Sequence, residues 1–440
     1  MTPARATGAR TAGDPYLPGS GNGGYTVEHY DLDLRYRVTT NRLDGRATIT
    51  ATATERLDVF SLDLSRLRVA RVKLEGRRGT GFTQAPGKLA IRPTAAIEAG
   101  ERFVLSVDYA GSPAPRASAW GEVGWEELTD GALVAAQPSG APTWFPCNDH
   151  PSSKARYDIR IASEAAYTVV CNGTLAATRI TSGMRHWHYR QDEPTATYLA
   201  TVQVGRYELG SADLGGTPGT LAYPPALRER VLGDLSNLPA MVAFFGDRFG
   251  PYPFPGYTIV VTDDELEIPL EAQGLAIFGA NHMDGAHGSE RLVAHELAHQ
   301  WFGNSVGLSA WRDIWLNEGF ACYAEWLWWE HTGNGSADGH AKRYRRLLST
   351  QPADIVIGDP GPARMFDDRV YKRGALTLHA LHTTIGDDAF FRLVHAWTDQ
   401  HRHGTATTDD FRALAATFTD VPLDGLFEAW LFGTALPRLP

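Results

Sequence analysis

The residues of this sequence best placed to do chemistry form the run His295-Glu296-Leu297-Ala298-His299. On an α-helix, two histidines four residues apart lie one turn apart on the same face, about 6 Å along the axis. Their ring nitrogens can therefore bind one cation, and the pattern favours zinc. Glu296 follows the first histidine, where a carboxylate can take a proton from metal-bound water. Because so short a motif also occurs by chance, the rest of the chain has to supply a third ligand.

Glu318 is the predicted third ligand. It follows His299 at a distance that lets one helix end, a loop return and a second helix present its first turn to the metal. Its setting is apolar, Trp315-Leu316-Asn317-Glu318-Gly319-Phe320, where an unpaired carboxylate would be costly. Two histidines, one glutamate and an open position are typical of a catalytic zinc site. The sequence therefore predicts one Zn²⁺ per chain.

Glu325 is a candidate for the surroundings of the metal. It lies about two helical turns after Glu318 and so on a similar face. A carboxylate there could orient a zinc-binding histidine by a hydrogen bond. An exposed, solvated position is the alternative.

Several runs resemble the aminopeptidase N family of zinc exopeptidases, gluzincins that also include leukotriene hydrolase. The runs 295–304 (HELAHQWFGN) and 316–321 (LNEGFA) match the zinc signature of that family at its spacing. The run 144–151 (WFPCNDHP) looks like its Phe-Pro-Cys-x-Asp-x-Pro stretch, and 250–253 (GPYP) resembles the turn before its catalytic domain. The resemblance implies an all-β, saddle-like sandwich followed by an α-rich α+β, thermolysin-like zinc peptidase domain. Family members usually continue into a helical C-terminal domain, so a short form lacking that domain is expected.

The resemblance also assigns Tyr371, in the run Val370-Tyr371-Lys372-Arg373-Gly374-Ala375. The tyrosine of the corresponding family segment binds the developing oxyanion through its hydroxyl. A phenol donor beside the metal supplies what a tetrahedral intermediate needs.

Glu271 is the residue that the resemblance assigns to the free amine of a substrate. The family holds that amine with the glutamate of a Gly-x-Met-Glu-Asn motif, and the run here is Pro269-Leu270-Glu271-Ala272-Gln273. The glutamate persists, whereas the flanking Gly, Met and Asn do not. A carboxylate there would pair with the ammonium group and place the first peptide bond over the metal. Nearby Glu265 and Glu267 leave an alternative alignment open.

Gln137, in Ala135-Ala136-Gln137-Pro138, resembles a glutamine of the β domain that assists amine recognition in the family. An exposed loop glutamine is the alternative.

Composition restricts the class of protein. The chain has 440 residues, 43% hydrophobic and 21% charged, which is typical of a globular protein with more than one core. A net charge of −10 and the lack of any basic block argue against nucleic acid as a partner. Three cysteines favour a reducing compartment over a disulfide framework. With no visible secretory signal and no apolar run of about 18 residues, the expectation is a cytoplasmic protein with no membrane partner.

The elements that must position these residues fall into three parts. Residues 1–24, rich in Gly, Pro, Ala and Thr, predict a flexible N-terminal segment. Apolar and polar residues then alternate, as half-buried strands require, which predicts an antiparallel β domain over 25–207. Helical spacing predicts the catalytic domain over 208–440. Its expected helices cover 227–249, a segment from the N-cap Ser289, 314–331 capped by Asp313, and 369–385 capped by Asp368.

Together these features predict a zinc metalloaminopeptidase that hydrolyses the N-terminal peptide bond of peptides with a free N-terminus. Glu296 is the expected general base and Tyr371 the expected oxyanion donor. A leukotriene-type epoxide hydrolase, which would use the same zinc and tyrosine, is one alternative. A non-catalytic peptide-binding relative is another, although such proteins typically lose the base or a ligand. The oligomeric state is open, with a monomer favoured.

Overall fold

A computed structural model describes residues 6–440, which form two compact units. The first unit, called here the β domain, runs to Leu209 and takes in two short segments, Ala222–Pro225 and Thr262–Asp264. The second, called here the helical domain, holds the rest of the chain. The boundary expected at 207/208 falls two residues before Leu209.

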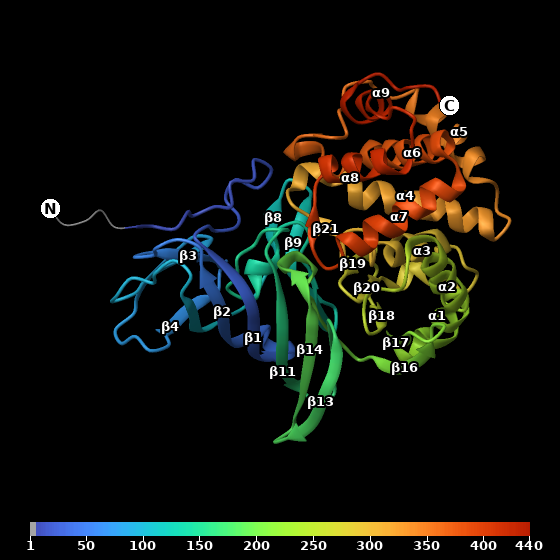
Figure 1. The fold of residues 1–440 in the computed structure, drawn as a ribbon. Helices are drawn as coiled ribbons and strands as arrows, with labels where there is room; N and C mark the ends of the chain where they lie inside the picture. The colour runs from blue at the N-terminus through green and yellow to red at the C-terminus, as the bar shows by residue number, and fades with distance from the viewer. Residues whose placement is uncertain (1–5) are drawn as a thin grey trace. The chain divides into compact units, whose positions relative to one another are not determined.

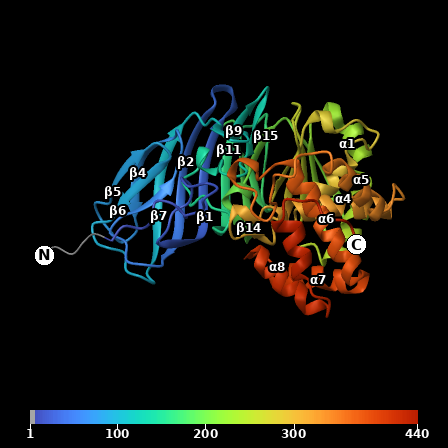
Figure 2. The same cartoon turned by 90° about the horizontal axis from the view of Figure 1, so that it is seen from above.

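The β domain is built from strands alone, apart from short 3₁₀ turns, so the all-β prediction is confirmed. Its largest sheet has seven strands in the order β13-β14-β11-β1-β2-β7-β4 (Figure 2). A five-stranded sheet has the order β12-β15-β10-β9-β8, and a three-stranded sheet the order β3-β6-β5. The strands are β1 Tyr25–Arg37, β2 Arg42–Ala53, β3 Phe60–Asp63, β4 Arg68–Leu74, β5 Gly81–Ala85, β6 Lys88–Arg92, β7 Arg102–Gly111, β8 Arg116–Ser118, β9 Gly121–Leu128, β10 Gly131–Ala135, β11 Lys154–Glu164, β12 Thr168–Cys171, β13 Thr174–Thr181, β14 Met184–Ala196 and β15 Val202–Gly205.

The prediction of a wholly antiparallel domain is wrong at one pair. β1 and β11 run parallel, with Leu32 opposite Ile159. Parallel neighbours cannot be joined by a hairpin, and here most of the domain lies between the two strands in the sequence. Alternation within a strand predicts which side chains are buried but not which distant strand becomes the neighbour.

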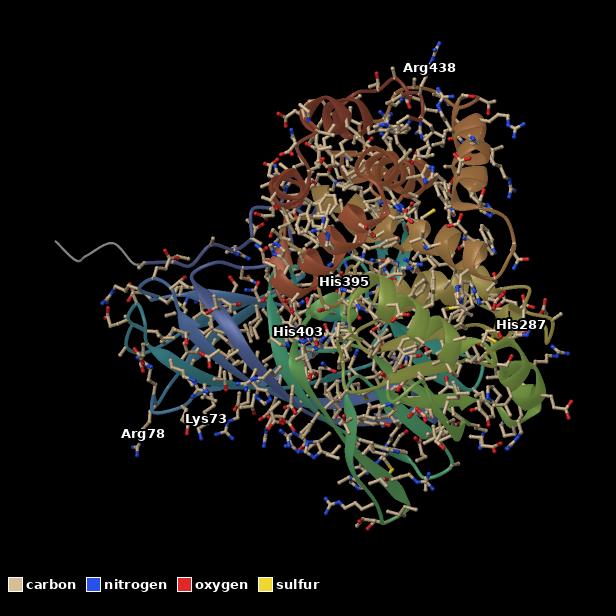
Figure 3. The ribbon with its side chains drawn as sticks, turned by 45° about the vertical axis from the view of Figure 1, so that its right-hand side comes forward. Lys73, Arg78, His287, His395, His403 and Arg438 are labelled. Carbon is tan, nitrogen blue, oxygen red and sulfur yellow. The ribbon has the colours of Figure 1, made fainter. Side chains whose placement is uncertain are left out.

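Alternation along the strands separates a buried face from a solvated one. In β1, Tyr30, Leu32, Leu34 and Tyr36 are buried, and they pack in the core shared by the sheets of this domain. In β4 three of the four exposed positions are basic, namely Arg68, Arg71 and Lys73, and Lys73 projects outward from the sheet (Figure 3). The amphipathic period of two is therefore what orders these sheets.

The N-terminal part of the β domain differs from the expected flexible segment. Residues 1–5 lie outside the described residues, but residues 6–24 are tied to the domain by hydrogen bonds. The backbone of Gly8 donates to Val59 O (2.9 Å), and that of Gly21 donates to Asp63 Oδ2 (3.1 Å). The side-chain amide of Asn22 also donates to Asp63 (2.8 Å). Gly and Pro content predicted a flexible segment here and did not predict these long-range contacts.

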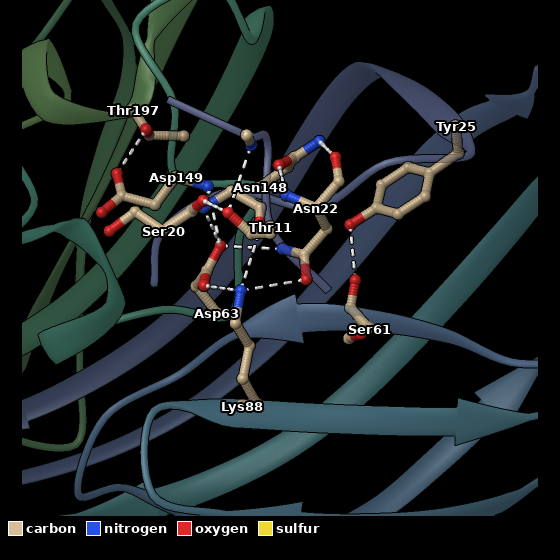
Figure 4. A network of polar contacts seen from close by, with 12 residues as sticks. Thr11, Ser20, Asn22, Tyr25, Ser61, Asp63, Lys88, Asn148, Asp149 and Thr197 are labelled. Atoms are coloured by element: carbon tan, nitrogen blue, oxygen red, sulfur yellow. Dashed lines mark hydrogen bonds and ion pairs between the residues drawn. The ribbon is translucent and has the colours of Figure 1, made fainter. Parts of the chain in front are cut away.

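A buried polar network joins this N-terminal segment to the sheets (Figure 4). The ammonium group of Lys88 donates to Gly21 O (2.7 Å) and to Asp63 Oδ1 (2.5 Å). Asp149, from the run WFPCNDHP, donates its backbone N–H to Asp63 and accepts from Thr197 Oγ1 (2.7 Å). Among the described residues, the second carboxylate oxygen of Asp149 has no hydrogen-bond partner. Burial, and next the Asp63 carboxylate, raises the pKa of Asp149 to about 7.

The helical domain holds one sheet in the order β16-β17-β18-β20-β19 (Figure 1). Its strands are β16 Glu208–Asp213, β17 Pro218–Tyr223, β18 Tyr257–Val261, β19 Leu270–Ala272 and β20 Leu275–Phe278, and a small pair is formed by β21 Gly307–Leu308 and β22 Thr405–Ala406. Its helices are α1 Arg228–Asp234, α2 Leu238–Phe249, α3 Glu290–Ala298, α4 Trp315–His331, α5 Ala337–Leu348, α6 Asp368–Ile385, α7 Asp387–Gln400, α8 Thr408–Ala415 and α9 Asp424–Phe427.

Three details of the predicted helices are wrong. The helix expected over 227–249 is broken into α1 and α2. Asp313 does not cap α4, because its carboxylate accepts hydrogen bonds from the backbone and hydroxyl of Thr408 (3.1 and 2.6 Å). The cap of α6 is Asp367, one residue before the expected Asp368. Long-range partners and one-residue shifts are features that local capping patterns do not determine.

Two further observations concern the helices and the cysteines. Across residues 6–440, every helix is too short or too polar to cross a bilayer. Cys147, Cys171 and Cys322 are all buried and carry free thiols.

The Asp63–Asp149 network predicts a pH-dependent stability. The folded-state pKa of Asp149 lies above the ordinary value of 3.8, so the stabilisation is fully present below pH 3.8 and is lost as the pH rises through about 7. Asp149→Asn keeps the acceptor for Thr197 and removes the titration. We expect the Tm of the wild type to fall by several degrees more than that of the variant between about pH 5 and pH 8. Calorimetric scans of both proteins measure this, and equal falls would contradict the role of Asp149.

Candidate metal centre and active site

The helix α3 carries both predicted histidines. Ser289 lies at its N-cap position, although its side chain makes no capping hydrogen bond, and His299 is its C-cap. The rings of His295 and His299 lie with their centroids 4.8 Å apart. Both residues are buried, at 8% and 1% exposure, so the two imidazoles face an interior point rather than solvent.

Glu318, in the first turn of α4, completes a set of three residues that could hold one metal ion. Its Oε2 lies 3.4 Å from His295 Nε2 and 3.5 Å from His299 Nε2. Zinc bonds of about 2.0–2.1 Å in a tetrahedron place neighbouring donor atoms about 3.3–3.4 Å apart. The two distances from Glu318 match this spacing, and the ligand atoms of all three residues lie within 4.8 Å of one another.

The other ring nitrogens are held by hydrogen bonds. His299 Nδ1 lies 3.0 Å from the carbonyl oxygen of Phe302, and His295 Nδ1 lies 2.8 Å from Glu325 Oε1. A carbonyl or carboxylate partner fixes the proton on Nδ1 and leaves the Nε2 lone pair for the metal. Both histidines are thus set in the tautomer that binds zinc.

The charges around this point are arranged for a cation. Burial alone would lower the pKa of His299, but the carboxylates of Glu271 and Glu318 outweigh it and raise that pKa to about 10. Burial would raise the pKa of Glu318, but His299 and His295 lower it to about 2. A cluster of carboxylates that stabilises positive charge this strongly is suited to a divalent ion.

Glu296 lies with a carboxylate oxygen within 4.8 Å of a ring nitrogen of His299 and is 4% exposed. Among the described residues, its Oε2 has no hydrogen-bond partner. Burial raises its pKa to about 7, against the opposing effect of the two histidines. A carboxylate that exchanges its proton near neutral pH is suited to general acid and base chemistry.

Tyr371, on α6, lies beside the metal ligands. Its ring stacks on that of His295, with centroids 6.1 Å apart and planes 17° from parallel. Burial, and next the Glu318 carboxylate, raises its pKa well above 10, so the hydroxyl stays protonated and can donate. The structure therefore places a phenol donor next to the ligand set.

α6 reaches this place because it crosses α4 at two glycines, Gly319 and Gly374. A Cβ atom built on Gly374 would lie 2.8 Å from the Cα of Gly319. Such close backbone approach needs glycine at both positions. The crossing sets the distance between Tyr371 on one helix and Glu318 on the other.

Glu271 lies on β19, opposite Ala276 of β20. A carboxylate oxygen of Glu271, one of Glu296 and a ring nitrogen of His299 all lie within 4.8 Å of one another. The structure thus brings the half-buried Glu271 to the metal centre despite the altered residues that flank it.

Glu325 is buried on α4 and lies between three groups. Besides His295, its Oε1 accepts a hydrogen bond from Arg291 Nη1 (3.0 Å). The ammonium group of Lys372 also lowers its pKa, although burial acts in the opposite direction. The carboxylate is therefore held ionised against His295, and the solvated alternative does not describe its position.

Gln137 follows β10 in the β domain, and the bond to Pro138 is cis. It thus belongs to the other compact unit from the ligand set. Sequence reasoning gave no role to Gln300 and Asn304, both fully buried and bonded to Ala272 beside Glu271. Their position within five residues after His299, in the run HELAHQWFGN, could have marked them as residues close to the metal centre.

A β domain followed by a helical domain with this ligand set defines the class of two-domain metallopeptidases. Residues 26–199 match the peptidase M1 N-terminal domain, and residues 234–430 match the peptidase family M1 domain. The chain belongs to peptidase family M1.

Curated relatives are distant and longer. Human endoplasmic reticulum aminopeptidase 1 is 25% identical over 433 residues, which covers 90% of this chain and 46% of that protein. Tricorn protease-interacting factor F2 of Thermoplasma volcanium is 25% identical over 331 residues, covering 70% and 42%. The chain spans less than half the length of these relatives.

Solved structures match along 98% of the chain. One is an M1 zinc metallopeptidase mutant from Deinococcus radiodurans bound to a Tyr-Ser-Ala substrate, with a TM-score of 0.88 and 29% identity, covering 98% of this chain and 99% of that one. A two-domain M1 zinc metallopeptidase mutant bound to L-arginine has a TM-score of 0.88 at 30% identity, with the same coverage.

The glycine crossing gives a first prediction about the site. Gly374→Ala should force α6 away from α4 and displace Tyr371, lowering kcat by about 10²-fold. Gly246→Ala is the matched control, because a Cβ there has no atom within 4 Å. Turnover of a peptide substrate by both variants is the measurement, with zinc content determined in parallel. Equal activity of both variants would contradict the role of the crossing.

The contact between Glu325 and His295 gives a second prediction about the site. Glu325→Gln keeps the volume but removes the charge that holds the imidazole, so zinc affinity should fall about 10–100-fold. Glu330→Gln, an exposed position on the same helix, should leave it unchanged. Competition with a chelator measures both affinities, and equal values would rule out the orienting role.

Proposed function

We propose that this protein is a zinc-dependent aminopeptidase that hydrolyses the N-terminal peptide bond of peptides. The observation that carries the proposal is the convergence of Glu296 and Glu271 with His299 within 4.8 Å, beside the ligand set of His295, His299 and Glu318. One carboxylate can act as the base, and the other can bind the substrate amine. A hydrolytic metal site alone does not need the second carboxylate.

Each residue of the site has a separate proposed role in the reaction. Bound zinc supplies Lewis-acid polarisation of the scissile carbonyl and lowers the pKa of a water molecule. Glu296 accepts the proton of that water as it attacks and returns the proton to the leaving amine. The hydroxyl of Tyr371 donates a hydrogen bond to the oxygen on which negative charge develops. Glu271 pairs with the substrate ammonium group, and Gln137 is proposed to assist it.

The similar proteins support this reading. The curated relatives include aminopeptidases, and a matching metallopeptidase structure holds the tripeptide Tyr-Ser-Ala. Other matching structures hold L-arginine and L-tryptophan, single amino acids with a free amine. Peptides with an unblocked N-terminus are therefore the proposed substrates here.

The test of the proposal is hydrolysis of a panel of aminoacyl amides by the wild type and by Glu296→Ala. We expect the variant to retain zinc and to lose at least about 10²-fold in kcat, because the base is gone. Full activity of the variant would overturn the mechanism. Peptides of the same sequence with an acetylated N-terminus should survive, and their cleavage at similar rates would indicate an endopeptidase.

A further inference from the structure

The turn that follows Glu271 is held by side chains from the segment after α3. β19 and β20 form a hairpin whose turn residues are Gln273 and Gly274, the latter at φ +69°. The backbone N–H of Gly274 donates to Gln300 Oε1 (2.8 Å). The carbonyl of Ala272 accepts from Gln300 Nε2 (3.3 Å) and from Asn304 Nδ2 (2.9 Å). Both ends of the turn are therefore bonded to one glutamine.

The same glutamine is tied to the residue that carries the proposed base. Gln300 Nε2 also lies 3.2 Å from the backbone carbonyl oxygen of Glu296. Gln300 and Asn304 are each 0% exposed, so water does not compete for these bonds. Through one amide, the backbone of Glu296 is connected to the residue next to Glu271.

β19 needs such a tether for two reasons. It is a three-residue edge strand, paired only with β20, and strands this short hold their place weakly. Before it come Ile268, which is 63% exposed, and Pro269, which has no N–H to donate. The bonds from Gln300 and Asn304 therefore add a second hold on the strand that carries Glu271.

We propose that Gln300 and Asn304 are positioning residues that fix Glu271 for recognition of the substrate's free amine. This inference rests on the proposed aminopeptidase function and deepens it. The hydrogen bonds of Gln300 and Asn304 are made to backbone atoms of residues 272 and 274, so they do not depend on the side chains that flank Glu271. Those flanking side chains are the ones that depart from the Gly-x-Met-Glu-Asn pattern, and the tether explains how Glu271 keeps its place without them.

The first test compares Gln300→Met and Asn304→Asp with the wild type on leucine p-nitroanilide. Both variants keep the side-chain volume and remove the donor to Ala272. We expect KM to rise about tenfold and kcat to stay within about threefold, with zinc content and Tm recorded. Ser305→Ala is the control, since Ser305 lies in the same turn but its Oγ accepts from His403 N. A fall in kcat with loss of zinc, at unchanged KM, would overturn the proposal.

The second test uses Glu271→Ala as a background. If Gln300 acts only through Glu271, then Gln300→Met has no further effect on KM once Glu271 is gone. Full additivity of the two changes would show a general structural role and would overturn the proposal.

A third measurement separates failure of the inference from failure of the proposed function. Calorimetric titration of zinc-loaded Glu296→Ala with the tripeptide Leu-Gly-Gly reports binding without turnover. We expect about tenfold weaker binding when Gln300→Met is added, and no change for the N-acetylated tripeptide. If Gln300→Met weakens binding in this way but the wild-type enzyme does not hydrolyse peptides, the aminopeptidase proposal alone is refuted. Equal affinity of Glu296→Ala and of the double variant Glu296→Ala/Gln300→Met for Leu-Gly-Gly would refute the role of Gln300.

Discussion

The constraint on which this site depends is the burial of three carboxylates around one point. Glu318 and Glu296 are almost fully buried, and Glu271 is half-buried beside them. Like charges in a medium of low dielectric repel strongly, so the arrangement is stable only with compensating positive charge. The raised pKa of His299 and the lowered pKa of Glu318 express the same demand. A divalent ion held by His295, His299 and Glu318 would meet it, with the surrounding elements keeping the carboxylates together.

Three contacts keep these groups in place, and each acts on a different element. The glycine crossing of α4 and α6 sets Glu318 against Tyr371. The Glu325 carboxylate, neutralised by Arg291, holds the ring of His295 on α3. The amides that follow α3 hold the edge strand β19. The first two contacts involve α4, and the last two involve α3 or the segment directly after it, so a shift of either helix would move more than one of these groups.

The sequence predicted the parts of the site that follow from local geometry. Four-residue spacing on a helix placed His295 and His299, and an apolar setting singled out Glu318. Resemblance to a family pointed to Glu271 despite its altered neighbours. The sequence could not supply long-range partners: the bond of Asp313 to Thr408, the docking of residues 6–24 on the β domain, or the parallel pairing of β1 with β11. Each of these depends on which distant segment arrives at a position, and local pattern carries little information about that.

The net charge of these buried groups bears on whether the site favours an exopeptidase or an endopeptidase. With Glu318, Glu296 and Glu271 ionised and a divalent cation bound, one negative charge remains at the centre. The ammonium group of a free N-terminus cancels it, and pairing with Glu271 recovers much of what desolvation of that carboxylate costs. An acetylated or internal peptide segment brings no such charge, so its binding would bury Glu271 against a neutral group. Under the proposed function, selectivity for the N-terminus therefore arises from unfavourable electrostatics for other substrates as well as from contacts with the correct one.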